Sequence, residues 1–287
     1  MKKYTRNDLL QLYEQAEREK YAIPAFNYSD QWDMMAIVEA ASEERAPVLL
    51  MSDPPVYQTI GPKMCAAMVD VLAEKADIPV IHHLDHSAHR SSCKEAIDLG
   101  FKSVMMDASD KPIEQNISYV KEVAEYARKN DCFVEAEIGR IRGESAYETS
   151  YTGDDYLFDL DEAVKLVEEG MPDSLAIGIG NAHGFYVGKP ELNFRKLAEA
   201  KEAISVPLVL HGGTGIPKED IQKAIRGGIR KVNVGTAVYC AYMNGIREQL
   251  IKDGENQFTL DVVRCGMERV KQVIKQWIRV CMANDRV

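Results

Sequence analysis

The sequence lacks any apolar stretch long enough to cross a membrane, and it lacks paired cysteines. None of its hydrophobic runs approaches the roughly 20 residues of a transmembrane helix. The N-terminal segment carries charged side chains where a signal peptide needs an apolar core. The six cysteines contain no C-x-x-C pair and lie far apart, at Cys65, Cys93, Cys132, Cys240, Cys265 and Cys281. These absences argue against a disulfide framework and a structural zinc–cysteine site, and they favour a cytoplasmic protein with no membrane partner.

The sequence also lacks an excess of positive charge and any obvious linker. Its formal net charge is −10 at pH 7. An acidic chain repels phosphate backbones, so we expect no nucleic-acid partner, and an anionic substrate would need a local group of donors. No Ser/Pro-rich or low-complexity segment divides the 287 residues. Since this length is normal for one α/β barrel, we expect a single domain over residues 1–287.

What the sequence does contain is a regular alternation of short apolar runs with longer amphipathic stretches. Eight apolar runs occur, at residues 25–27, 48–51, 80–85, 104–107, 133–138, 175–179, 207–213 and 231–235. The stretches between them have helical periodicity, which predicts parallel strands joined by crossover helices. Eight such units in about 250 residues predict an α/β fold of the (β/α)8 TIM-barrel type, with an extra C-terminal helix from Phe258 onward. A doubly wound sheet is the alternative, but the first run lacks its glycine-rich turn.

Histidines gather at the ends of three predicted strands. All six lie within or just after the third, sixth and seventh runs, at His82, His83, His86, His89, His183 and His211. Catalysis in a TIM barrel takes place at the carboxyl ends of the strands, and imidazole is a preferred ligand of Zn²⁺. We therefore expect His86, His183 and His211 to bind zinc and to leave one coordination position open. His89 is the alternative to His86, whereas His82 and His83 point to opposite faces and are expected to be structural.

Carboxylates end two further predicted strands. Asp107 ends the fourth run, and Glu137 lies near the end of the fifth. We expect both to line the metal site, either as partners of the histidines or as an alternative set of ligands. Glu135 shares a strand face with Glu137, and we expect it to form an ion pair inside the barrel.

Glycine-rich segments end the last two predicted strands. HGGTG occupies residues 211–215 and NVGT residues 233–236. In TIM barrels the loops after the seventh and eighth strands often hold a phosphate, on backbone N–H groups and a helix N-terminus. We therefore expect a phosphate to bind between these two segments, which contain Gly212, Gly213, Thr214, Asn233, Gly235 and Thr236.

Six ordered motifs resemble the class II, metal-dependent ketose-bisphosphate aldolases. They are HLDH at 83–86, VMMD at 104–107, VEAEIG at 134–139, NAHGFY at 181–186, LHGGTG at 210–215 and NVGT at 233–236. The resemblance implies a zinc-dependent barrel that reversibly cleaves a sugar phosphate, a phosphorylated ketose, with dihydroxyacetone phosphate as the ketone product. It implies zinc on the three histidines, a monovalent cation (Na⁺ or K⁺) near the phosphate, and a homo-oligomer, either a dimer or a tetramer.

The resemblance also implies roles for single residues. Asp85 would take the proton from the C4 hydroxyl of the substrate. Gly184 would join the glycine-rich segments in holding the dihydroxyacetone phosphate half. A loop glutamate would handle the C3 proton, with Glu144 as the nearest candidate and Glu148 as the alternative. A Schiff-base mechanism would need a desolvated lysine at a strand end, and Lys231, at the start of the eighth run, is on the wrong side.

The eighth-strand segment departs from the fructose-bisphosphate type. That type resembles N-x-D-T-D-x-x-R, whereas this sequence has Gly235, Ala237 and Cys240 at the charged positions. The tagatose-bisphosphate type has a small residue at the Gly235 position, so the sequence is closer to that type. The loop after the fifth strand adds Arg140 and Arg142, and arginine binds phosphate or carboxylate with two parallel hydrogen bonds. We therefore expect an aldehyde product with an anionic tail.

Two other functions fit the same fold. A non-catalytic, aldolase-like subunit would have lost the histidines or Asp85, and this sequence keeps them. A zinc hydrolase would use its metal to activate water, and the two glycine-rich segments expected to bind phosphate argue against that function.

Overall fold

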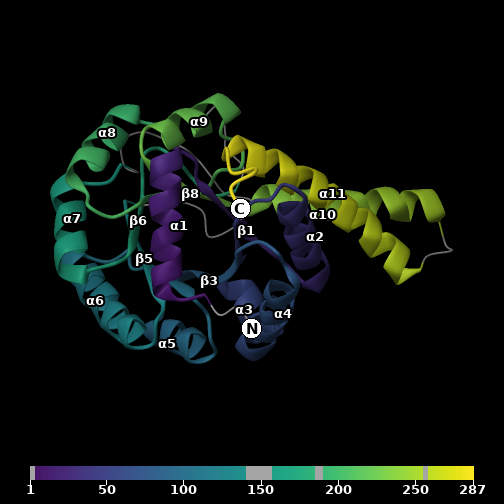
Figure 1. The fold of residues 1–287 in the computed structure, drawn as a ribbon, viewed down its shortest axis with the longest axis horizontal. Coiled ribbons are helices and arrows are strands. Elements are labelled where there is room, and N and C mark those ends of the chain that lie inside the picture. The colour runs from purple at the N-terminus through teal and green to yellow at the C-terminus, as the bar shows by residue number, and fades with distance from the viewer. Residues whose placement is uncertain (1–3, 140–156, 185–189, 255–257) are drawn as a thin grey trace.

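A computed structural model describes residues 4–139, 157–184, 190–254 and 258–287. In these residues, eight parallel strands close into a barrel in the order β1 to β8, and β8 pairs with β1 (Figure 1). The predicted TIM barrel is confirmed. The strands are β1 (Ile23–Asn27), β2 (Val48–Ser52), β3 (Val80–Ser87), β4 (Ser103–Met106), β5 (Phe133–Ile138), β6 (Ser174–Ile177), β7 (Leu208–Leu210) and β8 (Ile229–Val234).

Helices surround the barrel and follow the strands in alternation. They are α1 (Arg6–Glu19), α2 (Gln31–Glu43), α3 (Pro54–Ile60), α4 (Pro62–Lys75), α5 (Arg90–Asp98), α6 (Ile113–Lys129), α7 (Leu160–Lys165), α8 (Phe194–Ala203), α9 (Lys218–Arg226), α10 (Thr236–Asp253) and α11 (Thr259–Val280). A π-helical turn at Leu166–Gly170 extends α7. None of the described helices is both long enough and apolar enough to span a membrane.

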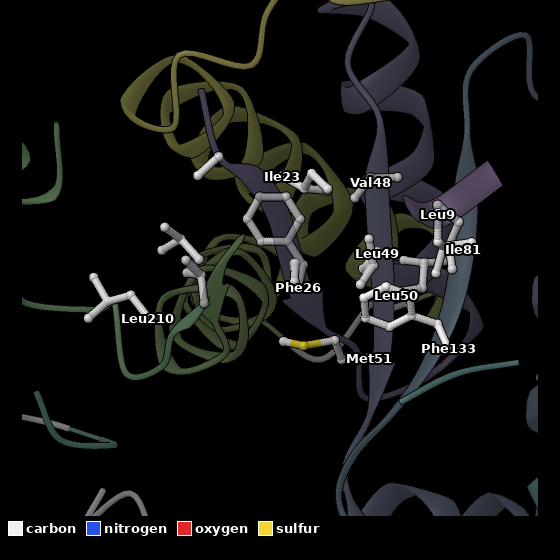
Figure 2. Close-up of a cluster of buried hydrophobic side chains, with 14 of the residues drawn as sticks. Leu9, Ile23, Phe26, Val48, Leu49, Leu50, Met51, Ile81, Phe133 and Leu210 are labelled. Atoms are coloured by element: carbon white, nitrogen blue, oxygen red, sulfur yellow. The ribbon is translucent and has the colours of Figure 1, made fainter. Parts of the chain in front are cut away.

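The barrel strands are buried on both faces, which explains their continuous apolar runs. Every residue of β1 and β2 is buried, and Phe26, Leu50 and Ile81 belong to the hydrophobic core (Figure 2). Parallel strands covered by crossover helices have this pattern. The predicted strand boundaries differ from the observed ones by at most three residues. Strand β5 agrees at both ends, whereas β1 begins at Ile23 and not at residue 25.

Helix α1 packs at the amino-terminal end of the strands. It begins with a capping box, in which the Thr5 hydroxyl accepts from the Asp8 amide at 3.1 Å and the Asp8 carboxylate accepts from the Thr5 amide at 2.7 Å. Tyr13 on its inner face stacks on Phe133, the first residue of β5, with ring centroids 5.0 Å apart. Together with ion pairs such as Arg6 with Asp173 and Glu17 with Arg230, this packing closes the amino-terminal end of the barrel.

The extra C-terminal helix is also present. Helix α11 packs against α2 and α10, with Val262, Val270 and Ile274 on its buried side. The α10–α11 hairpin extends beyond the barrel, on the yellow side of Figure 1. At its outer end Ile251 is 77% exposed and Phe258 is 75% exposed. Helix α11 thus covers α2 on the outside of the barrel, and the outer end of the hairpin carries exposed apolar side chains.

Candidate active site

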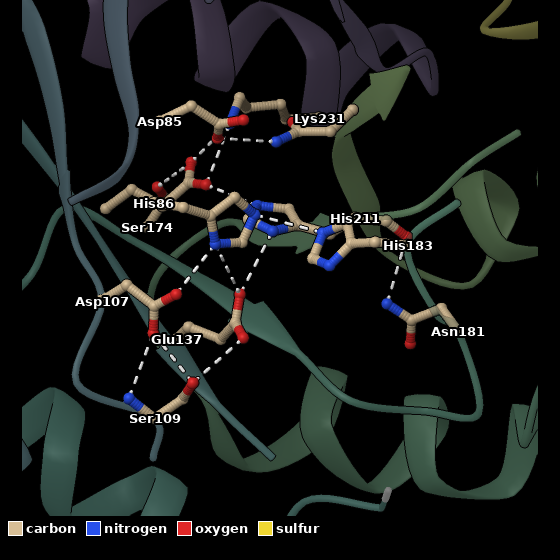
Figure 3. A network of polar contacts seen from close by, with 12 residues as sticks. Asp85, His86, Asp107, Ser109, Glu137, Ser174, Asn181, His183, His211 and Lys231 are labelled. Carbon is tan, nitrogen blue, oxygen red and sulfur yellow. Dashed lines mark hydrogen bonds and ion pairs between the residues drawn. The ribbon is translucent and has the colours of Figure 1, made fainter. Parts of the chain in front are cut away.

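An irregularity at the end of β3 determines where His86 points. The pairing of β3 with β4 shifts register between Leu84 and Ser87, and His86 has a positive φ of 45°. In a regular strand, the neighbours Asp85 and His86 would point to opposite faces. A residue in the left-handed region breaks that alternation. As a result both side chains reach the carboxyl end of the barrel (Figure 3).

Three imidazoles converge at that end. His86 Nε2 lies 3.1 Å from His183 Nε2, and the His86 and His211 ring centroids are 4.7 Å apart. One ligand atom from each of the three histidines can be chosen so that all lie within 4.8 Å of one another. His183 follows β6 and His211 follows β7. The structure therefore brings together the three predicted zinc ligands, from three different strand ends.

Asp107 and Glu137 border the same cluster. Nδ1 of His86 donates to Asp107 Oδ2 at 2.8 Å, and His211 Nδ1 lies 3.1 Å from Glu137 Oε2. The Ser109 hydroxyl bridges the two carboxylates, at 2.8 Å from Asp107 Oδ1 and 3.2 Å from Glu137 Oε1. His86, Asp107 and Glu137 form a second group with metal-ligand geometry. Both carboxylates lie at the carboxyl ends of their strands, beside the histidines.

Glu135 connects the cluster to the barrel interior. Its Oε1 accepts from His211 Nε2 at 2.9 Å, and both of its oxygens accept from Lys231 Nζ at 2.9 Å. The expected ion pair inside the barrel is present. Lys231 is the third residue of β8, not the first, and its ammonium group lies inside the barrel near the histidines. Because this group is held by Glu135, it is not the free amine that a Schiff base requires.

Two amides hold the carboxylate of Asp85. Asn27 Nδ2 donates to Oδ2 at 3.0 Å, and Asn233 Nδ2 donates to Oδ1 at 3.1 Å. Asp85 is 3% exposed, so its direction is set by these bonds and not by water. Asn27 is a site residue that the sequence reasoning missed. It ends the first predicted strand, and a polar residue at that position of a TIM barrel could have indicated a site residue.

The electrostatics of the cluster favour one positive charge among the imidazoles. Burial lowers the pKa of His86, but the charges of Asp85, Asp107 and Glu137 outweigh it and raise that pKa to about 10. Burial and the charge of His86 hold the pKa values of His183 and His211 well below the usual range. Burial would raise the pKa of Asp85, yet the positive charges around it lower that pKa. Two neutral imidazoles and an ionised carboxylate are thus available beside a place that attracts a cation.

This donor set fits a zinc ion. Buried polar groups normally have hydrogen-bond partners, yet His211 Nδ1 and Glu137 Oε2 form no hydrogen bond with any described residue. Asp107 occupies Nδ1 of His86 and Glu135 occupies Nε2 of His211, so the opposite nitrogen of each ring is the one left to bind a metal. Three imidazoles, two of them with a carboxylate on the nitrogen that faces away from the metal, fit a zinc site that keeps an open position.

The sequence matches the class-II fructose-bisphosphate aldolase family over residues 7–286. The chain belongs to this family. Its structure is similar to the X-ray crystal structure of the YdjI aldolase from Escherichia coli K12, with 32% sequence identity and a TM-score of 0.87 over 97% of this chain and 98% of that chain. The crystal structure of fructose-bisphosphate aldolase from Campylobacter jejuni shares the fold, with 22% identity and a TM-score of 0.85 over 99% and 96% of the two chains.

In this aldolase, the two glycine-rich loops are tied together at the rim of the barrel. Gly213 donates its amide to Asn233 O at 3.0 Å, and the Thr214 hydroxyl accepts from the Ala237 amide at 3.1 Å. Gly212 has a φ of 64°, and a Cβ there would lie 2.0 Å from the Ala182 carbonyl oxygen, so the close approach to the His183 segment requires glycine. The loops meet at the start of α10, where Thr236 is the first helical residue.

Most of the remaining predicted residues can be placed. Gly184 follows His183, with a φ of 80°. His83 lies inside the barrel with its Nδ1 2.7 Å from Ser103 Oγ, whereas His82 stacks on Phe101 at 3.6 Å between ring centroids. His89 is exposed at the start of α5, apart from both groups of candidate ligands. Outside the described residues lie Arg140, Arg142, Glu144 and Glu148.

Proposed function

We propose that this aldolase is zinc-dependent and that it reversibly cleaves a ketose 1-phosphate into dihydroxyacetone phosphate and an aldehyde. The observation that carries the proposal is the convergence of His86, His183 and His211 beside Asp85, whose carboxylate is held by two amides. Aldol cleavage needs stabilisation of the charge that develops on the ketone oxygen and a nearby proton acceptor. In the proposal, a metal on the three histidines meets the first need and Asp85 meets the second.

Zinc held by the three histidines would polarise the ketone and its neighbouring hydroxyl as a Lewis acid. Asp85 takes the proton of the C4 hydroxyl. As the C3–C4 bond breaks, C4 and its oxygen become the aldehyde carbonyl. Asn27 and Asn233 keep the carboxylate directed at that hydroxyl during the transfer. The electron pair of the broken bond moves from C3 toward the C2 carbonyl. A proton must then return to C3, and Glu144 or Glu148 is proposed as its donor.

The dihydroxyacetone phosphate half would lie on the glycine-rich rim. Backbone N–H groups at a helix N-terminus favour an anion, and the start of α10 meets both loops there. The residues proposed for this half are Gly184, Gly212, Gly213, Thr214, Asn233, Gly235 and Thr236. A Na⁺ or K⁺ ion near the phosphate belongs to the same proposal.

The finer features of the substrate rest on sequence. Gly235 is small, as in the tagatose-bisphosphate type, and we propose that fructose 1,6-bisphosphate is a poor substrate. An anionic tail on the aldehyde would be bound by Arg140 or Arg142. A cytoplasmic location, a homo-oligomer and a single domain over residues 1–287 remain predictions.

The test is a panel of ketose phosphates supplied to the purified, zinc-loaded protein. Released dihydroxyacetone phosphate is measured by its enzymatic reduction with NADH. We expect at least one ketose 1-phosphate to release it, and we expect chelation to stop the release. Release of inorganic phosphate in its place would indicate a hydrolase, and no turnover of any ketose phosphate would contradict the proposal.

A further inference from the structure

A tyrosine–aspartate pair lies at the rim of the site. The Tyr239 hydroxyl donates to Asp53 Oδ2 at 2.9 Å. Asp53 Oδ1 accepts from the Val56 amide at 3.0 Å and thereby caps α3. Both side chains are half-buried, so each keeps some open surface. Neither residue has a part in the chemistry described above.

The strand pairing places this pair beside Asp85. Ser52 pairs with Leu84, so Asp53 follows β2 at the level at which Asp85 follows Leu84 on β3. Tyr239 lies in the first turn of α10, directly after the glycine-rich loop that follows β8. Since β1 lies between β8 and β2 in the barrel, the hydrogen bond from Tyr239 to Asp53 spans the end of β1. The pair therefore forms the wall of the site between the loop of β8 and Asp85.

We propose that Asp53 and Tyr239 select the aldehyde half of the substrate, binding hydroxyl groups beyond C4 and rejecting a phosphate at that place. The inference rests on the proposed function, because it assumes that the C1 phosphate lies on the glycine-rich rim and that C4 faces Asp85. With both ends fixed in this way, the carbons after C4 pass along the wall that the pair forms.

The chemistry of the pair explains the selection. A carboxylate has about four acceptor positions, and the Tyr239 hydroxyl and the Val56 amide use two of those on Asp53. The others can accept sugar hydroxyls. A phosphate there would meet the negative charges of Asp53 and Asp85 in a partly buried wall, where screening is weak. The restriction concerns atoms close to C4, not a charge farther along a longer ketose.

The chain contains a matched control pair. Asp30 caps α2, and its Oδ2 accepts from the Tyr242 hydroxyl at 3.1 Å. This pair repeats the arrangement of Asp53 and Tyr239, since it joins a helix-capping aspartate to a tyrosine of the same helix α10. The negative charge of Asp85 is one of the causes that raise the pKa values of Asp53 and Tyr239. It is not among the main causes of the raised pKa of Tyr242.

The experiment compares kcat/KM for fructose 1-phosphate and fructose 1,6-bisphosphate in the zinc-loaded full chain. We expect the wild type to prefer the monophosphate. Asp53→Asn keeps a good helix cap and removes the charge, so the preference should fall by about tenfold, mainly through faster turnover of the bisphosphate. Tyr239→Phe should raise KM for the monophosphate more than it lowers kcat. Asp30→Asn and Tyr242→Phe should leave the preference unchanged.

Exchange of dihydroxyacetone phosphate protons with solvent, followed by NMR, separates this inference from the proposed function. Exchange needs only the ketone half, so Asp53→Asn should retain it. Normal exchange with an unchanged preference in Asp53→Asn would overturn the inference alone. A wild type that prefers the bisphosphate would overturn the inference together with the proposed substrate preference, and it would leave the aldolase activity standing. A wild type without exchange or cleavage would overturn both.

Discussion

At the residue scale, Asp85 is the side chain whose surroundings most restrict its chemistry. It is buried, and each of its oxygens accepts from a different amide. Burial would raise its pKa, but the charges of His86 and Lys231 and the hydrogen bond from Asn27 outweigh this effect and lower it. An ionised carboxylate held in a fixed direction is suited to accepting a proton, because little reorganisation is needed when the substrate arrives.

Replacing Asp85 with asparagine tests this role. The amide has nearly the same shape but cannot take the proton, so we expect kcat to fall by about 10²- to 10⁴-fold. Zinc content, measured by atomic absorption, should stay at the wild-type level. A variant with near-normal kcat would contradict the role, and a loss of zinc would show that Asp85 supports the metal site instead.

A second residue-scale prediction separates His86 from His89. His86 Nε2 faces His183 and its Nδ1 is held by Asp107, whereas His89 is exposed at the start of α5. We expect His86→Ala to lose zinc and activity together. The matched control His89→Ala should keep both. Loss of zinc from His89→Ala with retention in His86→Ala would mean that the ligand is misassigned.

At the element scale, the loop after β8 and the end of β1 depend on each other. Phe26 pairs with Val234, which brings Asn27 to the level of Gly235. A Cβ at Gly235 would lie 2.7 Å from Asn27 Oδ1. A side chain at position 235 must therefore displace Asn27, one of the two residues that hold Asp85. The small residue that separates this sequence from the fructose-bisphosphate pattern is thus coupled, through Asn27, to Asp85.

We expect Gly235→Ala to lower kcat by about tenfold, the effect of roughly one hydrogen bond to a charged group. If it acts through Asn27, the double variant Gly235→Ala/Asn27→Ala should be no slower than Asn27→Ala alone. Steady-state kinetics on the three variants measure this coupling. Additive losses would indicate that position 235 acts directly on the substrate.

A substitution in helix α1 should change the stability of the protein and leave its active site unchanged. Tyr13 is 2% exposed and stacks on Phe133 at the end of the barrel opposite the site. Its replacement by alanine should leave a cavity and lower the free energy of unfolding by about 3–5 kcal/mol. Urea denaturation measures the loss, while zinc content and KM of the folded protein should be unchanged. A selective change in KM would show that α1 also supports the site.

The same elements show how far sequence alone could predict the structure. The alternation of apolar runs and helical periodicity predicted the barrel, because each strand is buried on both faces between helices. The histidines, Asp107 and Glu137 could be assigned to one end because their positions along each strand fix their height in the barrel. Contacts between strands could not be predicted in this way. Three features depend on register and packing between strands that are distant in sequence. They are the bulge at His86, the hydrogen bond from Asn27 to Asp85, and the hydrogen bond between His211 and Glu135.

At the scale of the whole molecule, packing and chemistry occupy opposite ends of the barrel. Helix α1 packs at the amino-terminal end, and every described candidate ligand lies at or near the carboxyl end. This division is general in TIM barrels and allows loops to change while the core is kept. It also means that one ion at the carboxyl end should decide whether the folded chain is active.

Titration of metal-free protein with Zn²⁺, with the cleavage of a ketose 1-phosphate measured at each step, tests the central claim most directly. Three histidines with an open position bind one ion, so dihydroxyacetone phosphate release should rise in proportion to added zinc and level off at about one ion per chain. Full activity before any zinc is added, or no activity at saturating zinc with every ketose phosphate tested, would contradict a zinc-dependent aldolase.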